Sequence, residues 1–290
     1  MSNPHRVIDK TYLSLDAAEE RGLIHRDYIA HCLRWSHVVK FLNRGHTYKE
    51  AIVLDVGCGK EMPLAKTLYV NKMSARHYIG VDANKFTIPD MLRGRKLSMS
   101  AWSETDVCAL DITDVSFNGA LPNILTCFEV LEHVTPEHCR RMLQKFQELT
   151  SPDAHYFIST PCWNGSAAAN HINEMAFYAL GALIEDLEYK IEGVYGTFAS
   201  ISDYKDYLHA VPTTDGNYVD MRSVFNSLRE YYDTNLLSVI FAPLFPAQSR
   251  NCLWHLVKLN PLLPNEKLFT LLGNQPTPWS QHPRWEDLNK

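Results

Sequence analysis

Short apolar runs rich in β-branched residues alternate with helical stretches along most of this chain, and this alternation limits the possible folds more than any other feature. Seven runs are predicted to be strands: 51–56, 77–82, 101–107, 123–129, 155–160, 189–195 and 251–259. Most of them lack the polar alternation of a strand that is exposed on one face, which is typical of parallel strands covered on both faces. The pattern therefore predicts an α/β fold with a doubly wound, seven-stranded, mostly parallel sheet.

Helical periodicity fills the N-terminal region and the stretches between the predicted strands. Apolar residues recur at helical spacing over 28–42, so residues 1–47 are expected to form an N-terminal helical extension. Thr135 and Pro136 are typical of a helix N-cap followed by a first turn. A further helix is predicted at about 174–187. Helices in these places would cover both faces of the sheet.

The main domain is predicted to span residues 48–260, followed by a Pro-rich tail at 261–290. Residues 200–248 break the alternation of strands and helices, and their apolar spacing predicts a helical insertion. This insertion is rich in tyrosine. We expect its tyrosines to form its own core, with the lining of a substrate cleft as the alternative: Tyr204, Tyr207, Tyr218, Tyr231 and Tyr232.

The net charge and the cysteine content limit which binding partners and which cellular compartment are expected. Lys plus Arg number 28 and Asp plus Glu 33 among 290 residues, a formal net charge of −5. Domains that grip a long phosphate backbone are usually basic, so a large nucleic acid is not an expected partner. The seven cysteines form no Cys-x-x-Cys pair. Zinc-ribbon and thioredoxin-like sites are therefore not expected, and scattered single cysteines fit a reducing cytosol.

The sequence contains no apolar segment of the length that a membrane span needs. The most apolar run, at 236–245, is about ten residues long and contains Pro243, whereas a span requires about 20 residues. The first residues lack the pattern of a signal peptide. We therefore expect a soluble, cytoplasmic protein with no membrane partner.

A glycine-containing turn follows the first predicted strand. Gly57 and Gly59 would let the backbone approach a ligand closely. Asp82 lies at the end of the second predicted strand, where a carboxylate can accept hydrogen bonds from both hydroxyls of an adenosine ribose. A purely structural turn is the alternative. Together these features predict a nucleoside-type cofactor.

Both NAD and S-adenosylmethionine would fit this turn and acid. Asp55 precedes the glycines, where its carboxylate can hold the cationic amino-acid end of S-adenosylmethionine. Lys60 and Glu61 stand where the third glycine of a pyrophosphate-binding loop is expected. Both features favour S-adenosylmethionine.

At this point the chain resembles the class I S-adenosylmethionine-dependent methyltransferases, in particular the ubiquinone-biosynthesis-type branch. The resemblance covers about 50–200 and the last strand, and it implies a Rossmann-like fold. Four segments carry it: 53–59 (VLDVGCG), 78–82 (YIGVD), 106–107 (DV) and 127–134 (CFEVLEHV). Glu61 departs from the glycine that is common in the family's loop.

The resemblance implies a role for each matching position. Asp55, Gly57 and Gly59 would surround the methionine end of S-adenosylmethionine. Asp82 would bind the ribose, with Ala83 beside the adenine. The remaining implied contacts are Asp106 and Val107 with the adenine, and Phe128 and Glu129 beneath the sulfonium.

Two acids and two histidines are expected to meet at the carboxyl ends of the fourth and fifth predicted strands. Glu129, Glu132 and His133 follow one strand and His171 follows the other. Such oxygen and nitrogen ligands suit Mg²⁺ or Mn²⁺, and the resemblance includes relatives that bind a metal with this arrangement. Other relatives share the Glu-His pair without a metal. We expect the metal-free outcome, in which these side chains wall the pocket and supply the base.

The sequence thus predicts methyl transfer to oxygen or nitrogen of a small-molecule or nucleotide-sized substrate. His133 or His171 would remove the acceptor proton, and Glu129 would lie beside the reacting methyl group. One alternative is an NAD(P)-dependent oxidoreductase, disfavoured by the missing third glycine. Another is a non-catalytic, methyltransferase-like binding subunit, disfavoured by the intact glycine turn and Asp82.

Overall fold

The protein is described here by a computed structural model of the 290-residue chain. The structure describes the following residues, to which all statements below refer: 26–44, 50–59, 62–71, 77–84, 104–163, 167–198, 211–212, 218–219, 227–232, 234–244, 246–259 and 269.

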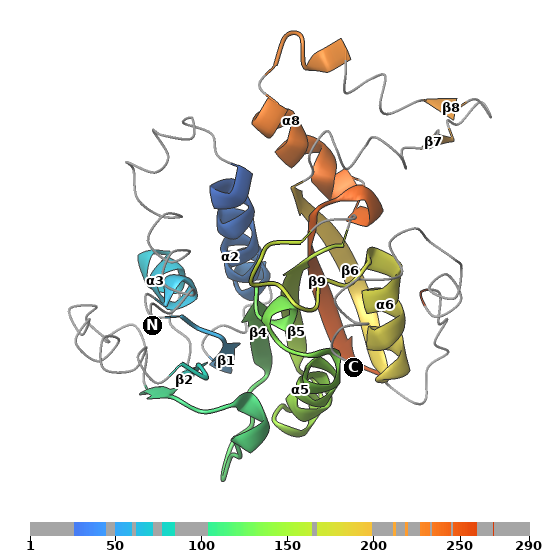
Figure 1. Ribbon diagram of the computed structural model, residues 1–290. Coiled ribbons are helices and arrows are strands. Elements are labelled where there is room, and N and C mark those ends of the chain that lie inside the picture. Colours follow the sequence, from blue (N-terminus) through green and yellow to red (C-terminus); the bar gives the residue numbers. More distant parts are fainter. Residues whose placement is uncertain are drawn as a thin grey trace.

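One seven-stranded sheet forms the centre of the molecule (Figure 1). Its order is β3-β2-β1-β4-β5-β9-β6. Only β9 runs antiparallel to its neighbours β5 and β6. The bounds are β1 Ile52–Val56, β2 His77–Val81, β3 Glu104–Cys108, β4 Ile124–Phe128, β5 His155–Pro161, β6 Tyr189–Phe198 and β9 Asn251–Lys258. The predicted α/β fold and all seven predicted strands are confirmed, with small shifts at the strand ends.

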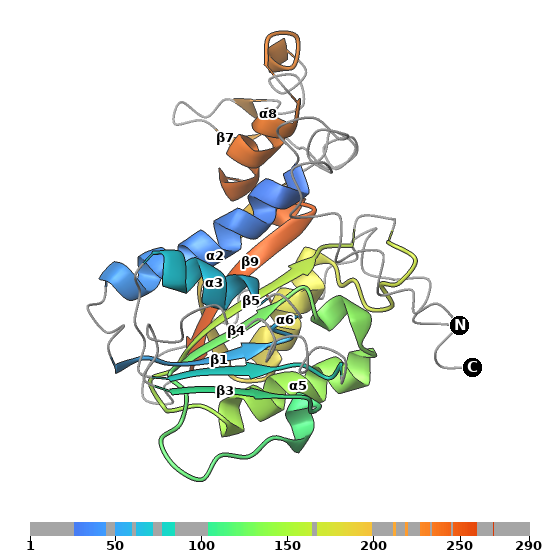
Figure 2. The same ribbon diagram turned by 90° about the vertical axis from the view of Figure 1, so that its left-hand side faces the viewer.

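Helices cover both faces of this sheet, as predicted (Figure 2). Helices α2 (Arg26–Arg44) and α3 (Pro63–Val70) lie on one face. On the other face lie α5 (Pro136–Glu148) and α6 (Phe177–Asp186). The predicted cap of α5 is present, because the Thr135 side chain accepts a hydrogen bond from the His138 backbone N–H.

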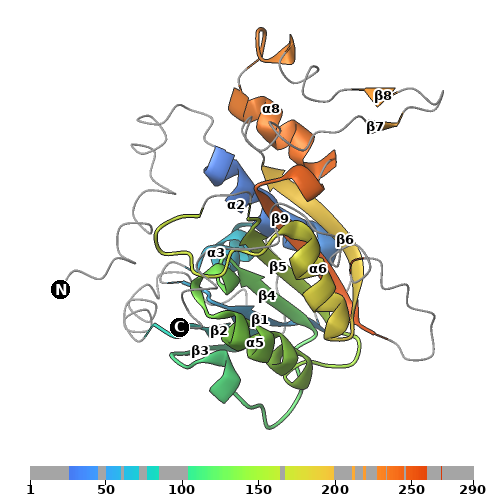
Figure 3. The same ribbon diagram turned by 45° about the vertical axis from the view of Figure 1, so that its right-hand side comes forward.

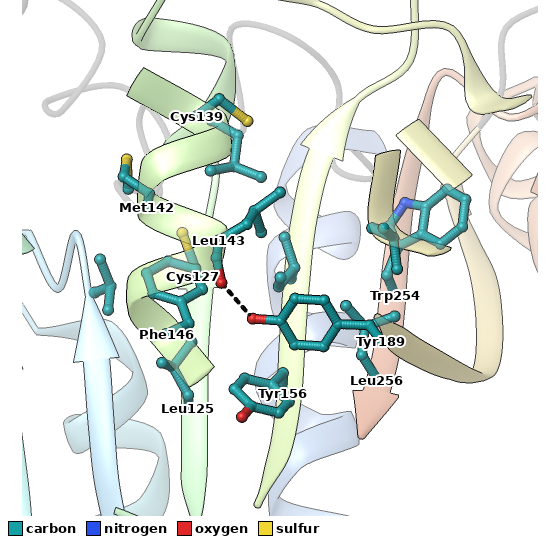
Figure 4. Packing of buried hydrophobic residues seen from close by; sticks show 14 of the residues in the cluster. Leu125, Cys127, Cys139, Met142, Leu143, Phe146, Tyr156, Tyr189, Trp254 and Leu256 are labelled. Atoms are coloured by element: carbon teal, nitrogen blue, oxygen red, sulfur yellow. Dashed lines mark hydrogen bonds between the residues drawn. The ribbon is translucent and has the colours of Figure 1, made fainter. Parts of the chain in front are cut away.

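The core beneath α5 combines apolar contact with satisfied polar atoms (Figure 4). Leu143 and Phe146 of α5 are fully buried against the sheet. Tyr189 of β6 is also fully buried, and its hydroxyl donates to the Leu143 carbonyl at 2.6 Å. A buried hydroxyl without such an acceptor would be costly. This bond therefore fixes α5 relative to the far edge of the sheet.

The region between β6 and β9 leaves the sheet at the carboxyl end of β6 (Figure 3). It contains α8 (Thr234–Phe241), which packs against α2 and β6. It also contains the paired strands β7 (Val211–Pro212) and β8 (Tyr218–Val219), which the prediction of a purely helical insertion missed. Two-residue strands are too short to produce a readable alternation.

The prediction that the insertion's tyrosines form its core is wrong for the two whose side chains are described. Tyr231 is 81% exposed and Tyr232 is 56% exposed. The side chains of the other three lie outside the described part of the chain. Helical spacing alone does not say which side chains of a segment are buried, and Tyr231 and Tyr232 lie in an exposed turn.

Short elements complete the described fold: the 3-10 turns η4 Ile112–Asp114, η5 Leu131–His133, η6 Ala242–Leu244 and η7 Pro246–Gln248. No helix in the described part of the chain has both the length and the apolar character that a membrane crossing requires. All seven cysteines are described, and none of them forms a disulfide.

Three histidines meet between α2 and the sheet. His155 Nδ1 lies 3.0 Å from His255 Nε2, and the His255 ring stacks on Phe157 with centroids 4.6 Å apart. His37 of α2 closes the group over Tyr195. Burial, with the nearby His155 and His37, lowers the pKa of His255 to about 4. Burial also lowers the pKa of His155 and of His37.

This cluster predicts that acid destabilises the fold. A histidine in the unfolded chain has a pKa near 6.5. Between that pH and about 4, the unfolded chain therefore binds a proton at this position, whereas His255 in the folded protein stays neutral. Stability is therefore full above about pH 6.5 and falls as the pH drops toward 4. We expect His255→Gln to reduce this loss by about 1–2 kcal/mol, after allowance for partial exposure.

Urea unfolding at pH 7.5 and pH 5 measures this change. The matched control is His138→Gln, because His138 lies outside the cluster, beside Asp111. An equal pH dependence in wild type and His255→Gln would contradict the prediction.

Candidate active site

The turn after β1 lies between the carboxyl ends of β1 and β2. Gly57 and Gly59 have φ of 71° and 66°, in the left-handed region that favours glycine. The Gly57 N–H donates to Val81 O at 2.7 Å, and the Gly59 N–H donates to Asp82 Oδ2 at 3.0 Å. Asp82 Oδ1 also accepts from the Asn84 N–H at 2.8 Å. The sequence-predicted turn and acid are thus physically joined.

Asp55 is buried directly beneath this turn. Its two carboxylate oxygens accept hydrogen bonds from Tyr78 Oη at 2.5 Å and Thr126 Oγ1 at 2.7 Å. Burial raises the pKa of Asp55 to about 6, although both hydrogen bonds oppose the rise. Asp55 therefore braces the neighbouring strands β2 and β4. Its contact with the methionine end of the cofactor remains a prediction.

The other predicted cofactor residues lie at or near the carboxyl ends of β2, β3 and β4. Ala83 is exposed, and Val107 and Phe128 are half-buried. Asp106 lies within β3, opposite Ile79, rather than in the loop that follows the strand. Its side chain lies outside the described part of the structure. The adenine contact of Asp106 remains a prediction.

Glu129 follows β4 in a backbone conformation that is unusual for its type, with φ of 58°. Its N–H donates to Ser159 O at 2.9 Å, and its Oε1 accepts from Ser159 Oγ at 2.9 Å. Asn251 Nδ2 donates to both carboxylate oxygens, at 3.0 and 2.9 Å. Arg34 Nη1 forms an ion pair with Oε1 at 2.6 Å. Sequence reasoning missed Arg34, Ser159 and Asn251.

Glu132, His133 and His171 form a second group at this edge. One ligand-type atom from each lies within 4.8 Å of the others, and the two imidazole centroids are 4.9 Å apart. Thr160 Oγ1 donates to Glu132 Oε2 at 3.2 Å. Burial, reinforced by the charge of Glu129, raises the pKa of Glu132. The structure thus brings together three of the four residues of the predicted acid-histidine cluster.

Each of the two imidazoles has a partner at its Nδ1 atom. His133 Nδ1 lies 3.2 Å from the Asn170 carbonyl oxygen, which can only accept, so Nδ1 donates and the lone pair lies on Nε2. His171 Nδ1 contacts Glu174, a fully buried carboxylate. Arg250 holds Glu174 from the other side at 2.6 Å. Sequence reasoning missed the roles of Glu174 and Arg250.

This second group has the donor set of a divalent-cation site. A carboxylate and two imidazoles, each imidazole held through its other nitrogen, are typical of metal ligands and their supporting partners. Glu129, the fourth predicted ligand, instead bonds with Arg34, Ser159 and Asn251. The same geometry serves a metal-free base, because a fixed imidazole with its lone pair on Nε2 can accept a proton.

Comparison with known proteins agrees with the architecture. A family model described as "Methyltransferase domain" matches residues 28–210. Among solved structures, the "StiE O-MT residues 961-1257" structure has a TM-score of 0.52 at 11% identity, covering 93% of this chain and 86% of its own. This likeness shows the fold. No curated protein matches.

Two further structures fall below a TM-score of 0.5. The magnesium protoporphyrin IX methyltransferase from Synechocystis PCC 6803, with bound SAM, has a TM-score of 0.49 at 12% identity and covers 89% of this chain and 98% of its own. The 1,6-didemethyltoxoflavin-N1-methyltransferase from Burkholderia thailandensis has a TM-score of 0.47 at 14% identity and covers 90% and 92%.

Proposed function

The chain belongs to the family of methyltransferase domains, and on this premise we propose that it transfers the methyl group of S-adenosylmethionine to an oxygen or nitrogen atom of a small-molecule or nucleotide-sized acceptor. The observation that carries the proposal is the hydrogen bond between the Gly59 N–H and Asp82. It joins the glycine turn, which follows β1 at the β1–β4 boundary where the strand order reverses, to the acid that follows the adjacent strand β2. Doubly wound sheets bind nucleotide-like ligands at such a point.

The residues at this edge fit S-adenosylmethionine. A Cβ at Gly57 would lie 2.2 Å from Val130 Cγ2, so only glycine lets the chain pass there, whereas the position of a Cβ at Gly59 is open space. Asp55, Gly57 and Gly59 would hold the methionine end, and Asp82 and Ala83 the nucleoside. The remaining contacts would come from Asp106, Val107, Phe128 and Glu129.

The bound cofactor supplies an electrophilic methyl group, and the protein's own residues do the rest. Alignment of the acceptor atom with that methyl group accounts for most of the rate gain. His171 and His133 would take the acceptor proton at Nε2, since their Nδ1 atoms face Glu174 and the Asn170 carbonyl. Glu174 and Arg250 hold His171 still during this transfer.

A second role for the same group is favoured by the convergence of Glu132, His133 and His171. A divalent cation held there would lower the pKa of an acceptor hydroxyl and orient it. We keep the metal-free reading as the main proposal, because His133 and His171 can act as bases directly.

Calorimetry with S-adenosylhomocysteine and with NADH tests the cofactor assignment. We expect binding of S-adenosylhomocysteine and none of NADH. Binding of NADH alone would favour an oxidoreductase, and binding of neither would favour a non-catalytic subunit. Tritiated S-adenosylmethionine, incubated with fractionated cell metabolites and nucleotides, would then identify the acceptor.

Asp82→Ala is expected to weaken binding of S-adenosylhomocysteine by about 1.5–3 kcal/mol, the range for hydrogen bonds to a charged group. The loss has two sources: the ribose contact and the release of the Gly59 N–H. Asp82→Asn keeps one acceptor oxygen and should lose less. Asp114→Ala serves as the control, because Asp114 is exposed on the η4 turn. An unchanged affinity in Asp82→Ala would move the ribose contact elsewhere.

A further inference from the structure

Arg34 connects helix α2 to the end of the sheet where the parallel strands have their carboxyl ends and where Glu129 lies. This end of the sheet is called the catalytic edge. The Arg34 side chain is 1% exposed, and its Nη1 lies 2.6 Å from Glu129 Oε1. The same guanidinium donates to Asn251 Oδ1 at 3.3 Å and contacts His31, three residues earlier on α2. Asn251 Oδ1 also accepts from Thr197 Oγ1 at 2.9 Å. The pair is therefore built into a network that joins α2 to β6 and β9.

The Glu129 carboxylate is fixed from several elements at once. Arg34 of α2, Ser159 of β5 and Asn251 of β9 all donate to it. Its backbone is also constrained, since the left-handed φ of 58° is unfavourable for a glutamate by about 1–2 kcal/mol. Strain of this kind persists only where surrounding contacts hold it and is common at functional sites.

The surroundings of Glu129 and Glu132 shift the pKa values of these two acids in opposite directions. Burial alone would raise the pKa of Glu129, but Arg34 and the hydrogen bonds from Asn251 and Ser159 bring it below its ordinary value. His31 also contributes to lowering the pKa of Glu129, although burial and Arg34 lower the pKa of His31 itself to about 3. Glu132 faces the same region, and burial together with Glu129 raises its pKa.

We propose that Arg34 is the positioning residue of Glu129: it holds the carboxylate in one orientation and keeps its negative charge at the catalytic edge. The inference rests on the proposed function, which places Glu129 beneath the sulfonium. Helix α2 then completes the active site instead of merely covering the sheet. A fixed carboxylate there would favour the cationic S-adenosylmethionine over its neutral product, S-adenosylhomocysteine, by an amount that the opposite charge of Arg34, 2.6 Å away, reduces.

Stability is a poor reason for such an arrangement. Arg34 is 1% exposed and Glu129 is 25% exposed. A largely buried ion pair of this kind rarely stabilises a fold more than apolar side chains of similar size, because the charges lose much of their hydration. Arg34 Nε is also buried without a hydrogen-bond partner, which adds to the cost. The contacts of Arg34 with Glu129 are therefore costly for folding. They are better explained by a functional role, in which Arg34 keeps the charge of Glu129 in place.

The direct test is the titration of Glu129 in protein labelled with ¹³C-glutamate, with its signal assigned by its loss in Glu129→Gln. We expect Glu129 to titrate below the ordinary range in wild type and above it in Arg34→Gln, and Arg34→Lys to restore a low value. Arg140→Gln is the matched control, because Arg140 pairs with Asp186 at the surface. An unchanged titration of Glu129 in Arg34→Gln would overturn the inference.

The functional readout is the ratio of Kd for S-adenosylhomocysteine to Kd for S-adenosylmethionine between pH 5 and 8. It should stay flat in wild type and change by about tenfold in Arg34→Gln as Glu129 titrates. A flat ratio in a folded Arg34→Gln protein would count against the inference. If wild type binds neither ligand, the proposed function fails, whereas the titration of Glu129 still decides the role of Arg34. If Arg34→Gln does not fold, the wild-type titration decides the question: a pKa of Glu129 within or above the ordinary range for glutamate would overturn the inference.

Discussion

Replacing His171 by alanine is expected to lower kcat by about 10²–10⁴-fold while S-adenosylmethionine still binds. The reason is geometric. His171 is held by the buried Glu174 and lies beside His133, at the edge where the acceptor would meet the methyl group. Loss of a general base slows proton removal without touching the residues predicted to hold the cofactor. Methyl transfer from the tritiated cofactor to the acceptor fraction, with calorimetry alongside, measures both quantities.

The matched control is His138→Ala, because His138 lies on α5 beside Asp111 and outside the cluster. Glu174→Gln supplies a second arm: it keeps the shape of the side chain but removes the charge that His171 and Arg250 share. We expect it to lower kcat by less than His171→Ala does. A normal kcat in His171→Ala would remove His171 from the mechanism.

Activity in excess EDTA distinguishes two roles of His133 and His171, that of a general base and that of a metal ligand. We expect full turnover in EDTA, which would leave His133 and His171 as bases. Loss of turnover that Mn²⁺ or Mg²⁺ restores would instead assign a cation to Glu132, His133 and His171. Calorimetry with Mn²⁺ alone checks this independently of the acceptor, since wild type and His171→Ala would then differ in metal affinity.

The sheet could be predicted because its signal is local. Each buried parallel strand needs apolar side chains on both faces, so runs such as 52–56 and 124–128 are readable without knowledge of their neighbours. The glycine turn and Asp82 could be placed for the same reason, since both follow directly from strand ends. The paired strands β7 and β8 of the insertion could not be predicted, because each is only two residues long.

The contacts that complete the site were harder to predict because they join distant segments. Asn251 begins an ordinary apolar strand and Arg250 precedes it, and nothing near them in the sequence points to Glu129 or Glu174. Arg34 did leave a signal. It stands four residues from both Ala30 and Val38, which are fully buried, so a charged side chain interrupts the apolar face of α2. A charge in that position requires a buried partner.

Gly57→Ala is expected to destabilise the fold by about 3 kcal/mol and to abolish cofactor binding. Two effects add: the left-handed φ of 71° is unfavourable for alanine by about 1–2 kcal/mol, and overpacking costs about 1–3 kcal/mol more. The overpacking is specific, because the new Cβ would lie 2.2 Å from Val130 Cγ2. Relief would have to move Val130, which adjoins Glu129 and Leu131 at the catalytic edge.

The neighbouring glycine provides the control for strain without overpacking. Gly59 has a similar φ of 66°, but a Cβ there meets nothing within 4 Å. Gly59→Ala should therefore lose only about 1–2 kcal/mol. Adding Val130→Ala to Gly57→Ala removes the clashing methyl group and should recover part of the difference, less the cost of the lost valine contacts. Urea unfolding and calorimetry with S-adenosylhomocysteine measure all four proteins. Equal losses in Gly57→Ala and Gly59→Ala would show that strain alone, and not the approach of Val130, makes glycine necessary in this turn.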